Sequence, residues 1–153
     1  MEHVRLIYFP ACRMVTSGTG FFGDKNFTKF EKMLAAEKNV SPYPMDFLTG
    51  NENGMEWLYL YRVGMDTLGM EVIEFPAGLY AVICGIDAQS NKAEMEAVAE
   101  FMEKNGLVRD ESRPDMGHII GNEETLAVLG YEQMDYWTPV KKDNKWKDHK
   151  NQF

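Results

Sequence analysis

Hydrophobic and polar residues alternate over several short segments of the chain, a pattern that predicts β-strands. The clearest case is residues 55–63, where alternation places Met55, Trp57, Tyr59 and Tyr61 on one face and Glu56, Leu58, Leu60 and Arg62 on the other. Further strands are expected over residues 4–9, 12–16, 45–49, 70–75, 79–87, 116–120 and 133–140. Turn-forming residues separate them, such as Pro10 and the cluster at 50–54.

Two longer segments follow a helical period instead. Their apolar side chains recur every three or four positions: Phe27, Phe30, Met33 and Leu34 within 26–38, and Met95, Val98, Ala99 and Met102 within 91–104. We expect Asp24 or Asn26 to cap the first helix and Asn39 to end it, with Ser90 and Gly106 in these roles for the second. The segments 17–20, 109–115 and 121–130 are predicted to be turns and loops.

The order strand–helix–strand–strand therefore occurs twice along the chain. This order favours the α+β class, in which an antiparallel sheet carries helices on one face. We predict a tandem duplication of this module with two main helices, forming one domain over residues 1–142 with halves of about 1–65 and 66–142. Residues 143–153 are predicted to be a charged, mobile tail.

The net charge of −8 is unevenly distributed. Residues 141–153 hold five lysines and two aspartates, which leaves 11 basic and 22 acidic side chains in residues 1–140. An acidic body repels phosphate backbones, so direct nucleic-acid binding is disfavoured, whereas small cations remain compatible with it. No apolar run approaches the ~20 residues of a membrane span, and Arg5 and Arg13 interrupt the N-terminal apolar run. We therefore expect a cytoplasmic protein with neither a membrane segment nor a secretion signal.

Cysteine and histidine residues give no sign of a metal site. Cys12 and Cys84 could form one disulfide, but we expect reduced, buried thiols because both lie in apolar strand-like runs. His3, His118 and His149 are far apart in the sequence, and none has a metal-ligand spacing. No metal ion and no cofactor are expected, and no phosphate-binding loop or nucleophile elbow is found.

Aromatic residues concentrate on a few of the predicted strands. The rings of Trp57, Tyr59 and Tyr61 share one face, and Asp135 stands beside Tyr136 and Trp137 on the last strand. Such rings can line a pocket for a planar or cationic molecule, with the carboxylate as its counter-ion. They can equally be ordinary core that packs against a helix, and Asp135 can be a surface residue of an edge strand.

Five segments, in their order and spacing, resemble a known family: residues 6–18 (LIYFPACRMVTSG), 44–47 (PMDF), 55–59 (MEWLY), 75–82 (FPAGLYAV) and 130–141 (GYEQMDYWTPVK). They are similar to the GyrI-like small-molecule-binding domain. This is the effector-binding domain of many AraC-type and MerR-type multidrug-responsive regulators, and it also occurs alone. The resemblance covers about residues 3–142, and we expect a stand-alone member.

The resemblance implies two modules related by a pseudo-twofold axis, with a central groove for hydrophobic, often cationic drugs. Trp57 and Tyr59 match the family's aromatic strand, and Asp135 matches the acidic position of its last strand. His118 stands near the place of an acidic pocket residue on the penultimate strand. The expected ligand-binding residues are Tyr43, Phe47, Trp57, Tyr59, Tyr61, His118, Asp135 and Trp137.

The first functional hypothesis is a binding module. It captures a hydrophobic or cationic small molecule, for sequestration or as an effector sensor linked to transcription regulation, through a partner regulator or a homodimer. The second is a hydrolase of cyclopropane-bearing or other electrophilic drugs, for which Glu56, Tyr59, His118 and Asp135 are the candidate groups. The third, also by resemblance, is a protein that shields a target such as DNA gyrase.

Overall fold

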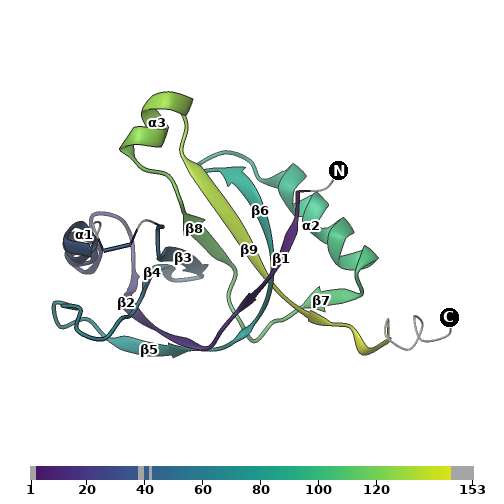
Figure 1. Cartoon of the computed structure of the whole chain (residues 1–153), viewed down its shortest axis with the longest axis horizontal. Helices are drawn as coiled ribbons and strands as arrows, with labels where there is room; N and C mark the ends of the chain where they lie inside the picture. The colour runs from purple at the N-terminus through teal and green to yellow at the C-terminus, as the bar shows by residue number, and fades with distance from the viewer. Residues whose placement is uncertain (1–2, 38–39, 42, 146–153) are drawn as a thin grey trace.

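The secondary structure comes from a computed structural model, which describes residues 3–37, 40–41 and 43–145. The strands are β1 (Arg5–Phe9), β2 (Cys12–Gly20), β3 (Asp46–Asn51), β4 (Gly54–Leu60), β5 (Val72–Phe75), β6 (Gly78–Ile86), β7 (Leu107–Arg109), β8 (Met116–Ile119) and β9 (Gln133–Lys142). The helices are α1 (Lys25–Glu37), α2 (Lys92–Lys104) and α3 (Glu123–Leu129). The first two lie far apart, over opposite ends of a curled sheet, and α3 projects beyond β8 and β9 (Figure 1).

The strands form one antiparallel sheet in the order β1-β6-β9-β8-β3-β4-β2-β5, with β7 also paired to β9. The order is unchanged when it is reversed and each strand is exchanged for its counterpart in the other half: β1 with β5, β2 with β6, β3 with β8 and β4 with β9. Strand β1 pairs with β6 of the second half, and β5 pairs with β2 of the first. The prediction of an α+β fold built on an antiparallel sheet is confirmed.

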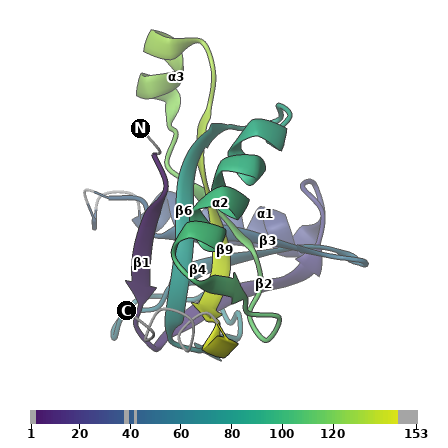
Figure 2. The same cartoon turned by 90° about the vertical axis from the view of Figure 1, so that its right-hand side faces the viewer.

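The pleat gives the sheet two different faces. One row of paired residues, Trp57–Leu48–Gly117–Tyr136, lies on the face that both long helices cover, which we call the helix face. The neighbouring row, Leu58–Phe47–His118–Asp135, lies on the opposite face, which we call the inner face. Figure 2 shows α2 lying across β6 and β9.

Each long helix packs most of its predicted apolar stripe on the helix face, although Ala99 of α2 is exposed. Phe27, Phe30 and Met33 of α1 are at most 1% exposed and pack with Trp57 and Tyr59. Val98 of α2 packs against β6 and β9. Since apolar burial contributes about 25 cal/mol per Å², these stripes fix both helices on the same side of the sheet.

The strand and helix boundaries follow the hydrophobic pattern closely, with small corrections. Strand β2 continues to Gly20 instead of turning at 17–20, because a register shift between Thr16 and Thr19 absorbs the irregularity. Strand β4 ends at Leu60, so Tyr61 lies beyond it. Of the two residues predicted to cap the first helix, Asp24 directly precedes α1 and its carbonyl accepts from the amide of Thr28, whereas Asn26 donates to carbonyls of residues 17–19. The cap residue of α2 is Asn91 instead of Ser90, although Ser90 Oγ accepts from the amide of Lys92 at 3.4 Å. Asn39 and residues 146–153 of the predicted tail lie outside the described residues.

Two elements were not predicted. Segment 107–109 is the short strand β7, which forms because it pairs with the end of β9. Segment 121–130 contains α3, which begins with a capping box between Asn122 and Thr125 and ends at Gly130 in a left-handed conformation. These local polar contacts stabilise a helix that buries no residue of its own.

Arg113, in the loop between β7 and β8, forms hydrogen bonds with both β6 and β9. Its guanidinium donates to the carbonyls of Leu79 and Val140 and to the carboxylate of Asp110, and it stacks over Tyr80 at 4.7 Å. It fits there because residue 78 is glycine: a Cβ at that position would stand 2.2 Å from Arg113 Cζ.

Both cysteines are free thiols, Cys12 half-buried and Cys84 exposed. The expected burial of Cys84 is therefore wrong. Its side chain lies on the inner face opposite Asp135, and partial burial and Asp135 together raise the pKa of the thiol.

Candidate functional site

The two faces of the sheet separate the predicted ligand-binding residues into two groups. Trp57 and Tyr59 belong to the helix-face cluster, whereas Phe47, His118, Asp135 and Trp137 are paired on the inner face. The expectation that Asp135 lies among the rings of Trp57 and Tyr59 is therefore wrong. Neighbouring residues of a strand point to opposite faces, and the strand register fixes which ones share a face.

Trp57 is a core residue at the centre of an aromatic cluster on the helix face. Its ring stacks on Phe30 with the centroids 4.9 Å apart, and the rings of Phe22 and Phe27 stand 5.3 and 5.7 Å away. The indole Nε1 donates a 3.0 Å hydrogen bond to Oδ2 of Asp46 on β3. The ring is thus held in one orientation, and its polar edge orients a carboxylate.

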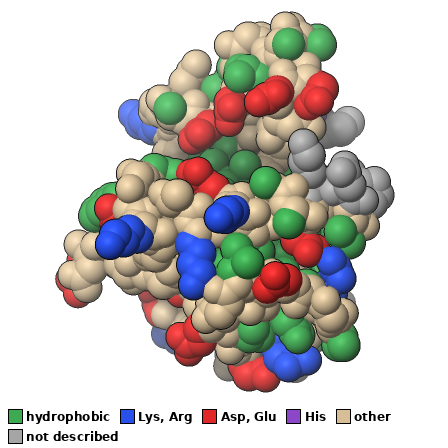
Figure 3. All heavy atoms as spheres, turned by 90° about the vertical axis from the view of Figure 1, so that its left-hand side faces the viewer, with side chains coloured by type: hydrophobic (Ala, Val, Ile, Leu, Met, Phe, Trp, Pro, Cys, Tyr) green, Lys and Arg blue, Asp and Glu red, His purple; other side chains and the backbone are tan. Residues whose placement is uncertain are grey.

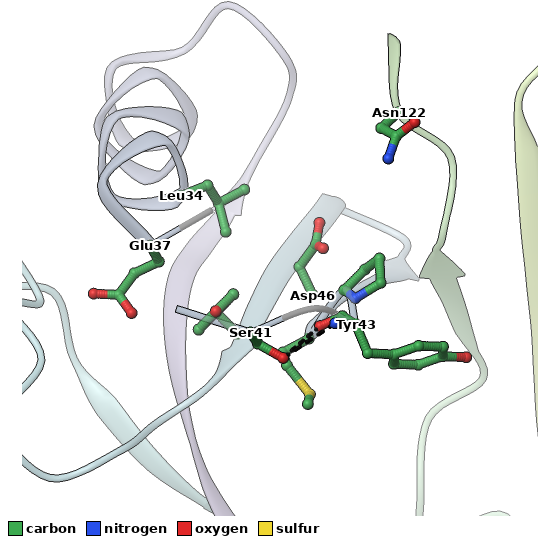
Figure 4. Close-up of a pocket in the computed structure, with 9 residues that line it drawn as sticks. Leu34, Glu37, Ser41, Tyr43, Asp46 and Asn122 are labelled. Atoms are coloured by element: carbon green, nitrogen blue, oxygen red, sulfur yellow. Dashed lines mark hydrogen bonds between the residues drawn. The ribbon is translucent and has the colours of Figure 1, made fainter. Parts of the chain in front are cut away.

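Asp46 opens onto a cavity of about 270 Å³, which we call the Asp46 cavity. It is lined by Leu34, Glu37, Ser41, Tyr43, Pro44, Met45, Asp46, Tyr59 and Asn122. In Figure 4 the Asp46 carboxylate points into the space between Leu34 of α1 and Asn122 before α3, while the Glu37 carboxylate points away from it. Apolar and aromatic walls therefore enclose one inward-facing carboxylate.

The two carboxylates of this cavity differ in their charge partners. Glu37 is 6% exposed and accepts three hydrogen bonds of 2.7–3.1 Å from Arg62. No lysine or arginine within the described residues forms an ion pair with Asp46. Burial raises the pKa of Asp46, and the hydrogen bond from Trp57 and the nearby His118 oppose this rise. Among the described residues, Asp46 is therefore the carboxylate of the cavity that lacks a lysine or arginine partner.

Replacing Arg62 with methionine is expected to destabilise the protein by about 3 kcal/mol, because it leaves the Glu37 charge buried without a partner. Chemical denaturation measures the loss. The double variant Arg62→Met/Glu37→Gln is the control, because it also removes the unpaired negative charge of Glu37 and should therefore be more stable than Arg62→Met. The explanation is wrong if the double variant is no more stable than Arg62→Met.

A second cavity of about 350 Å³, which we call the Trp57 cavity, lies on the same face. It is lined by Phe22, Leu48, Met55, Trp57, Asp87, Ile119, Glu132, Gln133 and Met134. Its floor is apolar, and the carboxylates of Asp87 and Glu132 are exposed at its rim. On the α1 side the surface is hollowed below the lobe that carries α3, with hydrophobic side chains in the hollow and acidic ones above (Figure 3).

The predicted polar residues of the inner face are only partly paired: Asp135 Oδ1 and His118 Nδ1 are buried and have no hydrogen-bond partner among the described residues. Asp135 lies 3.6 Å from Arg5, and His118 stacks on Phe47 with the ring centroids 4.5 Å apart. The Nε2 atom of His118 is 2.8 Å from the carbonyl of Pro44. His118 thus supports the chain that enters β3, beneath the Asp46 cavity, without lining it.

The remaining two predicted residues lie at the edges of these groups. Tyr43 is 53% exposed, lines the Asp46 cavity and contacts the ring of His118 at 5.4 Å. Tyr61 follows β4, and the guanidinium of Arg13 stands 4.8 Å above its ring.

The four candidate groups for hydrolysis lie on two different faces of the sheet. Tyr59 is on the helix face, whereas His118 and Asp135 are on the inner face. Glu56 also points to the inner face, where it accepts a hydrogen bond from Thr16. No group of three or more His, Cys, Asp or Glu side chains that could hold a metal is found in the described part of the chain. None of the described helices is long and apolar enough to cross a membrane.

Sequence reasoning missed the acidic residue of the cavity. In the sequence Asp46 stands out only as part of the segment 44–47, because the strand register that places it beside Trp57 is not visible there. Alternation along β3 does place Asp46 and Leu48 on one face, so the register of β3 against β4 is the missing information.

No family model matches the sequence, and no curated protein matches it. Solved structures share its fold. A hydrolase from Listeria innocua has a TM-score of 0.64 at 13% identity, with 92% of each chain covered. The EcmrR C-terminal domain has a TM-score of 0.59 at 12% identity, over 93% of this chain and 99% of that one. SAV2435 bound to tetraphenylphosphonium has a TM-score of 0.50 at 15% identity, over 90% and 93%.

Proposed function

We propose that this protein is a GyrI-like effector-binding domain that binds a small aromatic cation in the Asp46 cavity, with Asp46 as the counter-ion. The observation that carries the proposal is a partly buried carboxylate that pairs with no lysine or arginine of the described residues and is enclosed by apolar and aromatic side chains. An organic cation supplies the missing charge, and its apolar body replaces water on the walls.

The hydrogen bond from Trp57 holds the Asp46 carboxylate in a fixed orientation before a ligand binds. It fixes Oδ2 of Asp46, so that Oδ1 is left for a ligand. The ring of Tyr59 forms part of the wall, and the carboxylates of Glu37 and Asp46 raise the pKa of its hydroxyl further, beyond the effect of burial. Burial is the largest cause of the raised pKa of Tyr59, and Arg62 opposes the contribution of the two carboxylates.

Two of the similarly folded proteins support a ligand-binding role. SAV2435 has been solved with tetraphenylphosphonium, a hydrophobic cation, and the EcmrR C-terminal domain belongs to a protein that was also solved on DNA. The role proposed for this chain is sensing or sequestration of such a ligand, with any DNA contact made by a partner protein. The alternative of hydrolysis is less favoured, because Tyr59 is separated by the sheet from the other three candidate groups.

Isothermal titration calorimetry with three naphthalene probes tests the proposal. 2-Naphthylmethylammonium is expected to bind more tightly than the neutral 2-naphthylmethanol, by about tenfold or more. The anion 2-naphthylacetate is expected to bind most weakly. Equal affinities for the three probes, or no binding of the ammonium, would contradict the proposal.

A further inference from the structure

Helix α3 carries an apolar surface that its own chain does not cover. Residues 121–132, which we call the α3 lobe, hold four large hydrophobic side chains that are at least 37% exposed: Leu126, Val128, Leu129 and Tyr131. Val128 is 83% exposed, and no residue of α3 is buried. Exposed apolar side chains that gather on one element are typical of a surface that binds another protein.

The charged residues of the α3 lobe are all acidic. They are Glu123, Glu124 and Glu132, and all three are exposed. Within the described part of the chain none of them forms an ion pair. A surface that complements the lobe therefore has an apolar floor and a basic rim.

A groove with these properties lies between α1 and the segment that follows β4. We call it the lysine groove; it has a volume of about 450 Å³ and is lined by Lys29, Lys32, Met33, Ala36, Glu37, Asp66 and Leu68. Lys25, Lys29 and Lys32 follow one stripe of α1, because they are four and three positions apart. All three are exposed, and none pairs with a carboxylate of the described residues.

The two carboxylates of the lysine groove have partners elsewhere. Glu37 accepts hydrogen bonds from Arg62, and Oδ1 of Asp66 accepts from the amide of Leu68 at 2.9 Å. The lysines are thus left to give the rim its positive charge, over an apolar floor.

The α3 lobe and the lysine groove lie on the same side of the molecule. In Figure 3 hydrophobic and acidic side chains of the lobe stand above the surface of α1, where Lys and Arg side chains gather. On this side α1 stands further out than α3 (Figure 1). A twofold axis that runs between the two surfaces brings each of them opposite its complement on a second copy, with the prominent α1 of one copy against the recessed lobe of the other.

We propose that two copies of this chain associate in this way, with the α3 lobe of each docked on the lysine groove of the other. The apolar side chains drive the association, and the charges select the surface and its orientation. The chain has 24 acidic and 16 basic residues, so much of a second copy repels the acidic lobe, whereas the lysine groove attracts it. This dimer does not depend on the proposed ligand.

Sedimentation velocity on the whole chain, from micromolar to millimolar concentration, tests the dimer with two charge-reversed variants. Lys29→Glu/Lys32→Glu makes the groove acidic, and Glu123→Lys/Glu124→Lys makes the lobe basic. Each variant is expected to self-associate at least about tenfold more weakly, because like charges then face each other at both contacts. A 1:1 mixture of the two variants is expected to form a mixed dimer, since both of its contacts again join opposite charges. Recovery in the mixture also shows that both variants are folded.

Lys141→Glu/Lys142→Glu is the matched control, because these exposed lysines at the end of β9 undergo the same change of charge. This control and the unmodified protein should both reach twice the monomer mass of 17.6 kDa at high concentration. If the unmodified protein stays monomeric at every concentration, the α3 lobe has a different occupant and the proposal is wrong. Charge-reversed variants that dimerise as tightly as the unmodified protein, or a mixture without a mixed dimer, would also overturn it.

Discussion

Replacing Asp46 with asparagine is expected to lower the affinity for 2-naphthylmethylammonium about 10- to 100-fold. A hydrogen bond to a charged group contributes about 1.5–3 kcal/mol, more than a neutral one. Asparagine keeps an oxygen that can accept from Nε1 of Trp57, so the indole stays in place. Calorimetry measures the affinity, and that for 2-naphthylmethanol should change less than threefold.

The pH dependence separates the role of Asp46 in binding from its role in stability. Only the ionised carboxylate attracts the cation, and because burial raises the pKa of Asp46, affinity should fall on acidification earlier than for an exposed aspartate. The ligand-free protein should respond in the opposite way. A raised pKa means that the folded state binds the proton more readily, so the contribution of Asp46 to stability rises as the pH falls through this range.

The Asp46→Asn variant should lack both responses. An affinity that is independent of pH between about 4 and 7 in the unmodified protein would show that Asp46 is not the counter-ion. A variant that binds the ammonium as tightly as the unmodified protein would show the same.

Replacing Gly78 with alanine is expected to cost about 3 kcal/mol of stability, the largest loss that we predict for a single added methyl group. The new Cβ would stand 2.2–2.6 Å from three atoms of the Arg113 guanidinium. That side chain is 7% exposed and is held by two backbone carbonyls and Asp110, so it cannot move aside without losing these bonds. For a domain of this size the loss corresponds to about 6–12 °C in melting temperature.

Gly50→Ala is the matched control, because Gly50 is also a strand glycine and a Cβ there meets nothing within 4 Å. Its melting temperature should differ by less than about 2 °C from that of the unmodified protein. The clash also predicts strong coupling: Gly78→Ala should add less than about 0.5 kcal/mol to the loss caused by Arg113→Ala. Additive losses would mean that the guanidinium is not the obstacle.

The order of elements was predictable from sequence because it depends on local periodicity. The stripes of α1 and α2 and the alternation along β4 each reflect which side chains face the sheet core. The two elements that were not predicted, β7 and α3, are stabilised by a contact with a residue distant in sequence or by polar contacts alone. Strand β7 depends on its pairing with β9, and α3 is held by its caps with no apolar stripe in the core.

The site was predicted in part, and the error has one physical cause. Alternation put Trp57 and Tyr59 on one face, and the structure agrees. To identify the carboxylate that lies beside these two rings, one needs the register between the strands. A shift of one residue in the register moves every side chain of a strand to the opposite face of the sheet. Asp135 and Asp46 are both acidic residues beside aromatic ones in sequence, but only Asp46 shares the face of Trp57.

The exchange of β1 and β5 between the halves has a consequence for how the chain reaches its native state. Each half completes its part of the sheet with a strand from the other: β1 pairs with β6 some 75 residues later, and β2 with β5 some 60 later. Closing such long loops costs entropy before any contact compensates for it, so folding should be slow for the domain's size. A fragment that ends near residue 65 would leave β1 without its neighbour and an open edge on β2, a template for aggregation.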